Sequence, residues 1–290
     1  MSEARLQIAD INISVVSNDS SLKIGLDTGM QDFSIENASP DLSVEACWRT
    51  LDDRNKGQLI FNSGGAWQLY LKDDCYWFHC GAPALGDVPY KIARLTRDFS
   101  SGQVYLHRPF FETGKAVYPL QYPLDELLIL NLLSQGRGAE VHACGIVDAD
   151  GNGYLFVGQS GAGKTTMARL WEKEVGIRIL SDDRIILRQD EEHIWMYGTP
   201  WHGEAEFASA SRAPLKQIYL ISHGKQNSLR DIAGVEAAAN LFTCSFPVFY
   251  SPDGLKFTID FYGTIVNHIP CNRLSVVPNS EVVAFIRQNQ

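Results

Sequence analysis

The chain has 290 residues, of which 45% are hydrophobic and 20% are charged, so its composition is that of a folded globular protein and excludes wholesale disorder. It carries 25 lysines and arginines against 34 aspartates and glutamates, and the net charge of −9 excludes a broad nucleic-acid or anionic-membrane surface. A small basic pocket for phosphate is still compatible with this charge. At about 150 residues per domain, the length indicates about two domains, and one large domain is the alternative.

The cysteines and the lengths of the apolar runs indicate in which cellular compartment the protein is located. The six cysteines form no CxxC pair and no zinc-finger spacing, so we expect reduced thiols, as in cytoplasmic proteins. The segment MSEARLQIAD lacks the basic and apolar stretches of a secretory signal. Apolar runs such as Leu127–Leu133 are far shorter than the about 20 residues of a membrane-spanning helix. We therefore expect a soluble, cytoplasmic protein that does not bind membranes.

Residues 1–118 are expected to form a β-rich N-terminal region. Alternating and β-branched segments between turn-rich stretches predict strands at Ile8–Val16, Leu42–Leu51, Gln58–Asn62 and Ala66–Lys72, with a turn at residues 72–74. The aromatic side chains of Trp48, Trp67 and Trp77 are expected to pack against this sheet. The region shows no spacing typical of a catalytic pair or a metal site, so its role stays open.

The pattern changes near residue 120. Tyr122-Pro123 precedes Leu124–Ser134, which is apolar on most sides and predicts a helix packed between layers. The segment Gly136-Arg137-Gly138 ends this helix. We therefore place the second domain at residues 119–290.

From residue 139 the pattern predicts strand, turn, strand, loop, helix and strand. Asp148–Asn152 is a strong hairpin turn between the first two strands. The predicted strands are Ala139–Val147, Gly153–Val157, Arg178–Ser181, Arg184–Arg188, Ile194–Tyr197 and Gln217–Ser222, and the predicted helices are Thr165–Val175 and Val235–Leu241.

The strongest chemical signal is a glycine-rich loop that satisfies the pattern G-x-x-x-x-G-K-[ST]. A predicted strand precedes it and a predicted helix follows it, the setting in which backbone N–H groups and a helix N-terminus hold phosphate. We expect Lys164 to reach the β- and γ-phosphates of ATP and the Thr165 hydroxyl to bind Mg²⁺. The alternative is a glycine-rich turn that matches by chance. The expected nucleotide-binding residues are Gly158, Ser160, Gly161, Ala162, Gly163, Lys164, Thr165 and Thr166.

Two adjacent carboxylates, Asp182 and Asp183, follow the apolar segment Ile179–Ser181. Carboxylates at a strand end beside a phosphate loop hold a metal or activate a nucleophile in phosphoryl transfer. Because like charges repel, one of the two can have a raised pKa and serve as the base. The alternative is a solvated turn that happens to carry two aspartates.

Two further segments carry candidate groups. His142 lies in the strand that leads toward the loop, and it is either a site residue or a histidine of the core. The glycines, proline and tryptophan of Gly198–Glu204 predict a rigid loop, in which His202 and Glu204 share one side of an extended chain. We expect Glu204 to face the metal. Alternatively, Trp201 fills a gap in the core and Glu204 is solvated.

Residues 119–290 resemble the kinase domain of the HPr kinase/phosphorylase family, whose fold group includes the nucleotide domain of phosphoenolpyruvate carboxykinase. The resemblance rests on the order and spacing of a histidine, a phosphate loop, a strand with a double aspartate and an arginine, and a glycine-rich acidic segment. In this chain these features are His142, Gly158–Thr165, Arg178–Arg184 and Gly198–Glu204. For a divergent member, the resemblance implies an α+β or mixed α/β fold, with a P-loop nucleotide-binding domain of this type preceded by the β-rich region.

The resemblance also implies roles for single residues. Asp182 would be the general base toward a substrate hydroxyl, with Asp183 and His142 in support. Thr165, Asp183 and Glu204 would be the metal ligands.

These observations predict an ATP-dependent kinase that transfers the γ-phosphoryl group to a hydroxyl, such as a serine of a protein or peptide, while Lys164 neutralises charge on the transferring group. One alternative is a non-catalytic nucleotide sensor, in which ATP binding orders a loop. Another is an enzyme similar to phosphoenolpyruvate carboxykinase. The presence of both aspartates and of His142 favours the kinase, since a sensor needs only the loop and a metal ligand. The expected partners are ATP, Mg²⁺ and a hydroxyl-bearing substrate, and a homo-oligomer is left open.

Overall fold

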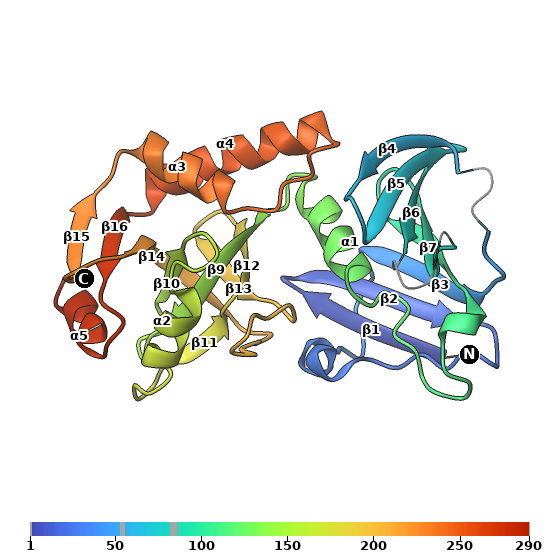
Figure 1. Cartoon of the computed structure of the whole chain (residues 1–290), viewed down its shortest axis with the longest axis horizontal. Helices are drawn as coiled ribbons and strands as arrows, with labels where there is room; N and C mark the ends of the chain where they lie inside the picture. The colour runs from blue at the N-terminus through green and yellow to red at the C-terminus, as the bar shows by residue number, and fades with distance from the viewer. Residues whose placement is uncertain (1, 53–55, 82–85, 87, 290) are drawn as a thin grey trace. The chain divides into compact units, whose positions relative to one another are not determined.

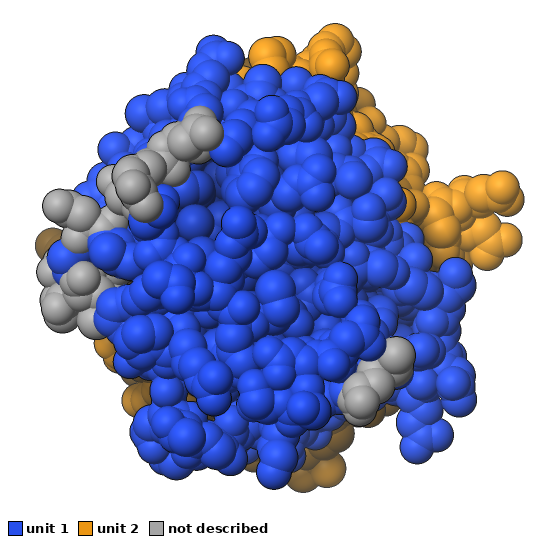
Figure 2. Space-filling model, turned by 90° about the vertical axis from the view of Figure 1, so that its right-hand side faces the viewer, with its two compact units in different colours: residues 1–132 blue, residues 133–290 orange. Residues whose placement is uncertain are grey.

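A computed structural model describes residues 2–52, 56–81, 86 and 88–289 (Figure 1). The chain divides into two compact units, residues 1–132 and residues 133–290, which Figure 2 shows in different colours. Helix α1 (Leu124–Leu133), which we predicted, belongs to the first unit in all but its last residue. The sequence analysis assigned this helix to the second domain, and the division after residue 118 stays a prediction.

The first unit is built on an eight-stranded mixed sheet in the order β1-β2-β3-β8-β7-β6-β5-β4. The pairs β2–β3 and β3–β8 are parallel, and the other neighbouring pairs are antiparallel. Trp48, Trp67 and Trp77 are half-buried on its strands, as predicted. The elements are β1 (Ser2–Ile8), β2 (Ile11–Ser17), β3 (Leu42–Trp48), β4 (Gln58–Asn62), β5 (Trp67–Lys72), β6 (Cys75–Cys80), β7 (Lys91–Leu95) and β8 (Ser101–Leu106), with the short 3-10 helices η1 (Thr28–Phe33) and η3 (Arg108–Phe110).

Two tight turns of this sheet use left-handed backbone. Ala9 and Asp10 join β1 to β2 with φ of 50° and 56°, and Asp73 and Asp74 join β5 to β6 with φ of 49° and 54°. Two consecutive residues with positive φ form the turn that best matches the twist of a hairpin. The predicted turn between β5 and β6 is thus confirmed. The single strand predicted at Ile8–Val16 is wrong, because the first of these turns divides it.

The second unit contains another eight-stranded mixed sheet, in the order β10-β9-β12-β13-β14-β16-β15, with β11 paired to β9. Because β10 also pairs in parallel with β14, the pairings of β9, β12, β13, β14 and β10 form a closed circuit. The strands are β9 (Ala139–Val147), β10 (Gly153–Val157), β11 (Arg178–Ser181), β12 (Arg184–Gln189), β13 (Ile194–Gly198), β14 (Arg212–His223), β15 (Ser228–Asp231) and β16 (Cys271–Val276), and the helices are α2 (Lys164–Trp171), α3 (Gly234–Thr243), α4 (Pro252–His268) and α5 (Glu281–Gln288).

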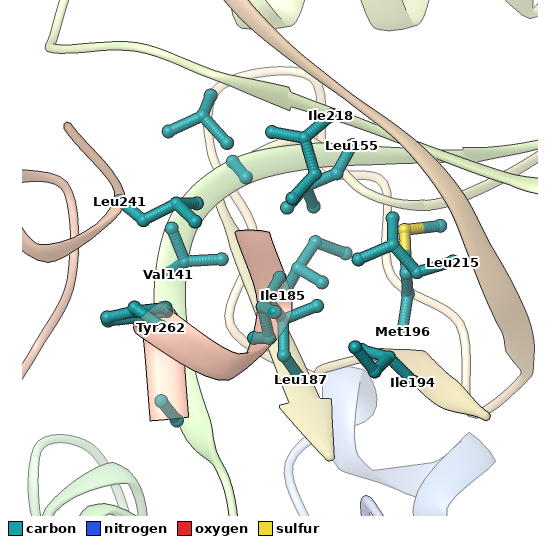
Figure 3. Close-up of a cluster of buried hydrophobic side chains, with 14 of the residues drawn as sticks. Val141, Leu155, Ile185, Leu187, Ile194, Met196, Leu215, Ile218, Leu241 and Tyr262 are labelled. Atoms are coloured by element: carbon teal, nitrogen blue, oxygen red, sulfur yellow. The ribbon is translucent and has the colours of Figure 1, made fainter. Parts of the chain in front are cut away.

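Buried side chains cover both faces of β10. Leu155 belongs to one hydrophobic cluster with Leu241 of α3 and Tyr262 of α4 (Figure 3). Tyr154 and Phe156 belong to a second cluster, to which α2 and α5 contribute. Successive residues of a strand face opposite sides of the sheet, so β10 is fixed from both sides. The first residue of the loop that follows β10 is therefore attached to a strand that is packed on both faces.

The fold class that we expected is wrong. We predicted an α+β or mixed α/β protein with a P-loop nucleotide-binding domain of the HPr kinase/phosphoenolpyruvate carboxykinase type. The structure is instead β-rich, with 38% strand, 22% helix and two large mixed sheets. A parallel α/β sheet needs a crossover, usually a helix, between successive strands. Here β12 and β13 form an antiparallel pair, and the described parallel pairs of the second unit are β10–β14 and β14–β16.

Gly198→Ala should destabilise the protein. A Cβ at Gly198 would overlap the backbone oxygens of Ser209 and Leu180, whereas one at Gly263 of α4 would meet no described atom within 4 Å. Because overpacking costs about 1–3 kcal/mol, we expect Gly198→Ala to lower the free energy of unfolding by about that amount. Gly263→Ala is the matched control and should raise it by about 0.5–1 kcal/mol, the gain from replacing a helical glycine. Urea unfolding curves measure both changes, and a stabilised Gly198→Ala variant would contradict this account of β13.

Candidate functional site

The glycine-rich loop Gly158–Thr165 connects the end of β10 to α2. Gly161 and Gly163 have φ of 80° and 103°, a region that favours glycine, and Gly163 is the N-cap of α2. A Cβ on Gly158 would lie 2.6 Å from the Cβ of Ala162, so the loop folds closely onto its own first residue. A compact loop at a helix N-terminus can present several backbone N–H groups to a phosphate.

The side chain of Lys164 is buried within this loop. Its ammonium donates hydrogen bonds to the carbonyls of Gly158 at 2.8 Å and Gln159 at 3.1 Å. Burial lowers the pKa of Lys164, although the nearby Asp183 carboxylate acts in the opposite direction. The ammonium therefore lies beside the first two residues of the loop.

His223 supports the loop from the neighbouring strand, and the sequence analysis missed it. It is the last residue of β14, which pairs in parallel with β10, and its Nε2 lies 2.8 Å from the carbonyl oxygen of Gly161. The available signal was a histidine directly after the predicted strand Gln217–Ser222. Its meaning depends on a pairing between distant segments that the local pattern does not show.

The buried carboxylate of Asp182 connects three segments. Its Oδ1 accepts a hydrogen bond from the backbone N–H of Gly203 at 3.0 Å. Its Oδ2 accepts from the backbone N–H of Ala205 at 3.2 Å and from the hydroxyl of Thr165 at 3.3 Å. A Cβ at position 203 would lie only 2.8 Å from Oδ2 of Asp182, so the close approach of the backbone to this carboxylate favours glycine at that position. Asp182 thus orients the Thr165 hydroxyl and holds the segment around Gly203 beside the loop.

Asp183 faces different partners. Its Oδ1 lies 2.8 Å from Nε2 of His142, and its Oδ2 accepts from the guanidinium of Arg184. The Asp183 and His142 side chains are 24% and 23% exposed. Burial acts to raise the pKa of Asp183, but the hydrogen bond from His142 and the charges of Arg184 and Lys164 outweigh it, so the pKa is lowered. Asp183 is therefore an ionised carboxylate that a histidine holds at the cavity wall, and it does not have the raised pKa that we expected for the base.

Arg184 is itself held in place on the opposite side. Its Nε lies 3.4 Å from a carboxylate oxygen of Glu140, and its guanidinium carbon lies 4.0 Å from the centroid of the Phe246 ring. A cation at this distance from an aromatic face is attracted to the ring. These contacts fix the guanidinium that pairs with Asp183.

A cavity of about 400 Å³ opens between the loop and the two aspartates. Gly158 and Ala162 line a neighbouring cavity, which shares Ser160 with the first. The predicted site residues thus come together from several separate segments. Those that line the first cavity are His142, Ser160, Gly161, Gly163, Lys164, Thr165, Thr166, Asp182, Asp183 and Glu204.

Trp201 and Glu204 lie in different environments. Trp201 is 8% exposed, so its side chain is buried. Glu204 is exposed, but its residue lines the cavity together with Thr165 and Asp183. The loop therefore combines a buried anchor with a carboxylate at the cavity wall.

The carboxylates and the hydroxyls of this cavity are groups that can bind Mg²⁺. Within residues 2–52, 56–81, 86 and 88–289, no group of three or more His, Cys, Asp and Glu side chains could hold a metal ion by itself. Mg²⁺ in nucleotide sites typically uses one or two carboxylates together with the phosphates. The Thr165 hydroxyl and the carboxylates of Asp182, Asp183 and Glu204 fit that requirement.

No protein-family model matches this chain, and no curated protein shows significant similarity to it. The resemblance to the HPr kinase/phosphorylase family therefore stays a prediction from the motifs of this sequence. In the part of the chain that the structure describes, no helix combines the length and the apolar character needed to cross a membrane.

Asp183→Asn should change how stability depends on pH. The folded-state pKa of Asp183 is lowered from its unfolded value of about 3.9, so the ionised group stabilises the fold above that value. This stabilisation is lost as the pH falls through the folded-state pKa. We expect the free energy of unfolding of the variant to fall less steeply than that of the wild type between about pH 5 and about pH 2. Denaturant titrations at a series of pH values measure this, and parallel curves would contradict it.

Proposed function

We propose that this protein is an ATP-dependent phosphotransferase that moves the γ-phosphoryl group of ATP to a hydroxyl. The observation that carries the proposal is a single cavity lined by a glycine-rich loop with Lys164 and by Asp182, Asp183 and His142. The loop and its lysine have the chemistry needed to bind phosphate, and the carboxylates have the chemistry needed to accept a proton. A protein that only senses nucleotide has no use for a carboxylate–histidine pair beside the phosphate loop.

The loop Gly158–Thr165 would bind the phosphates through its backbone N–H groups and the N-terminus of α2. Lys164 donates to two loop carbonyls, and phosphate oxygens would be stronger, charge-assisted acceptors for the same ammonium. The Thr165 hydroxyl, which Asp182 orients, and the Glu204 carboxylate would hold Mg²⁺. When bound, Mg²⁺ offsets part of the negative charge of the phosphates.

Asp183 is better suited than Asp182 to accept the proton. Both carboxylates are engaged by protein groups, Asp183 by His142 and Arg184, but the side chain of Asp182 is buried and its bonds hold Gly203, Ala205 and Thr165 in place. Asp183 is partly exposed at the cavity wall, where His142 fixes its orientation. In the transfer, the acceptor oxygen forms a bond to the γ-phosphorus while the bond from that phosphorus to the β–γ bridging oxygen breaks. The electron pair of that bond leaves with ADP, the hydroxyl proton passes to Asp183, and Lys164 stabilises the charge on the transferring group.

We also propose a cytoplasmic location. All six cysteines are free thiols, and reduced thiols are ordinary in the cytoplasm. Burial raises the pKa of Cys144, so this thiol is protonated and unreactive at neutral pH. The proposed substrate, ATP, is abundant in the same compartment.

Lys164→Ala should weaken Mg-ATP binding by about 2–4 kcal/mol, or roughly 30-fold to 1,000-fold, because it removes a charge-assisted contact to the phosphates. Lys173→Ala is the matched control, since it removes an exposed lysine that follows α2, and it should leave the affinity within about twofold. Isothermal titration calorimetry measures both variants. Wild-type affinity in Lys164→Ala would remove the basis of the proposal.

The two aspartates should respond differently to substitution by asparagine. Asp182→Asn disturbs the bonds that hold Thr165 and Gly203, so Mg-ATP affinity and phosphoryl transfer should fall together. Asp183→Asn should keep Mg-ATP affinity within about tenfold and slow transfer by about 10²–10⁴, the range for loss of a general base.

Calorimetry and the transfer of radiolabelled γ-phosphate to molecules of a cell lysate measure the two effects. If Asp182→Asn lost transfer with binding intact, Asp182 would be the base. A wild type that binds Mg-ATP and transfers nothing would be a nucleotide sensor.

A further inference from the structure

Ser181 ends β11 directly before the two aspartates, but it does not line the cavity between them and the glycine-rich loop. Its side chain is fully buried, with an exposed fraction of 0%. Its backbone pairs with Gly145 of β9 on one side and forms an isolated bridge to Ala208 on the other. Because neighbouring segments hold the backbone from both sides, the Ser181 hydroxyl is attached at a fixed point of the sheet.

Asp182 and Asp183 form a bend between two strands that both pair with β9. The antiparallel pairing of β11 with β9 ends at Ser181, and that of β12 with β9 begins at Arg184. A bend can remove backbone N–H groups from the regular ladder, and a buried N–H group then needs another acceptor. The Ser181 hydroxyl is such an acceptor, because its Oγ accepts from the N–H of Asp183 at 3.2 Å and from the N–H of Arg184 at 3.1 Å.

The bonds from Ser181 act on one aspartate more than on the other. Three hydrogen bonds to its own carboxylate hold Asp182 in place, one of them from the Thr165 hydroxyl. The carboxylate of Asp183 instead faces His142, at 2.8 Å. Because Ser181 binds the backbone N–H of Asp183, its hydroxyl contributes mainly to the position of the aspartate that we propose as the base.

The Ser181 hydroxyl also connects the bend to the loop between β13 and β14. Its proton is donated to the carbonyl oxygen of Trp201, at a distance of 3.4 Å. The hydroxyl of Thr199, which is fully buried as well, lies 3.2 Å from the same oxygen and 2.8 Å from the carbonyl oxygen of Arg184. Two buried hydroxyls therefore join the bend to the loop whose backbone N–H groups hold Asp182.

We infer that Ser181 is a positioning residue for phosphoryl transfer, because its hydroxyl fixes the bend that presents Asp183 to the acceptor. The inference rests on the proposed function, in which Asp183 accepts the proton of the acceptor hydroxyl. Since its side chain is fully buried outside the cavity wall, Ser181 would contact neither ATP nor the acceptor. A catalytic group that is misplaced by about 1 Å can slow a reaction about a hundredfold. Loss of the Ser181 hydroxyl should therefore lower the rate of transfer more than the affinity for Mg-ATP.

The first test compares rate with affinity in the full chain. Ser181→Ala should slow the transfer of radiolabelled γ-phosphate to a cell lysate, at saturating Mg-ATP, by about tenfold to a hundredfold. Its Mg-ATP affinity, measured by calorimetry, should stay within about threefold, because the three bonds of Asp182 are kept. Ser181→Thr keeps the hydroxyl and should recover most of the rate.

Ser17→Ala is the matched control. Ser17 is also fully buried and ends β2, and its hydroxyl accepts from the backbone N–H of Asp19 at 3.2 Å. The substitution therefore removes the same kind of bond in the other unit, and it should leave the rate of transfer within about twofold.

Amide hydrogen exchange, followed by NMR on the full chain without nucleotide, separates this inference from the proposed function. The amides of Asp183 and Arg184 should exchange about fivefold to a hundredfold faster in Ser181→Ala than in the wild type, because both lose their acceptor. Ser17→Ala should leave these two exchange rates unchanged.

Unchanged exchange in Ser181→Ala, or transfer at the wild-type rate, would overturn the inference. A loss of Mg-ATP affinity as large as the loss of rate, or a folded Ser181→Thr variant as slow as Ser181→Ala, would overturn it as well. A wild type that transfers no phosphate would contradict the proposed function, whereas faster exchange in Ser181→Ala would then still support a bend fixed by Ser181. If circular dichroism shows that Ser181→Ala is unfolded, Thr199→Val removes the second hydroxyl of this network, and the same loss of rate with retained affinity is expected.

Discussion

The parallel pairing of β10 with β14 is the interaction on which the candidate site depends. Its register places Val157 opposite Leu220, so the two strands end close together. The glycine-rich loop follows one strand, His223 ends the other, and the contact between His223 and Gly161 connects them. Because side chains cover both faces of β10, this edge of the sheet is a fixed support for the loop. If the two strands separated, the loop would lose the support that holds it beside the cavities that it lines.

Asp182 provides a second support, on the side of the loop away from β14. A buried carboxylate is costly unless hydrogen bonds satisfy it, and here two backbone N–H groups and the Thr165 hydroxyl do so. These bonds fix a segment that has little regular secondary structure of its own. The adjacent Asp183, which lies with Asp182 in the bend between β11 and β12, faces other partners. One aspartate therefore organises the cavity, while the other remains at its surface.

The loop could be predicted because its signal is local: β10, the glycines, Lys164 and α2 follow one another directly in the sequence. The double aspartate was also recognisable, but the partners that distinguish the two carboxylates come from other segments. The fold class could not be predicted, because the closed circuit depends on pairings between distant strands, such as β10 with β14. The turn at Ala9-Asp10 lacks the glycine or asparagine that usually marks a hairpin, and α4 contains interior glycines that weaken a helical pattern.

The closed circuit of pairings also restricts how the second unit can join other chains. Among the described strands, β9, β10, β12, β13 and β14 each pair with two others of the circuit, so none of them offers a fully open edge to a strand of another molecule. The described strands of this unit that have a single partner strand are β11 and β15, which are four residues long each, and β15 carries the charges of Arg230 and Asp231. Short, charged edge strands resist edge-to-edge aggregation. A homo-oligomer would therefore form through side-chain surfaces of this unit rather than by extension of its sheet.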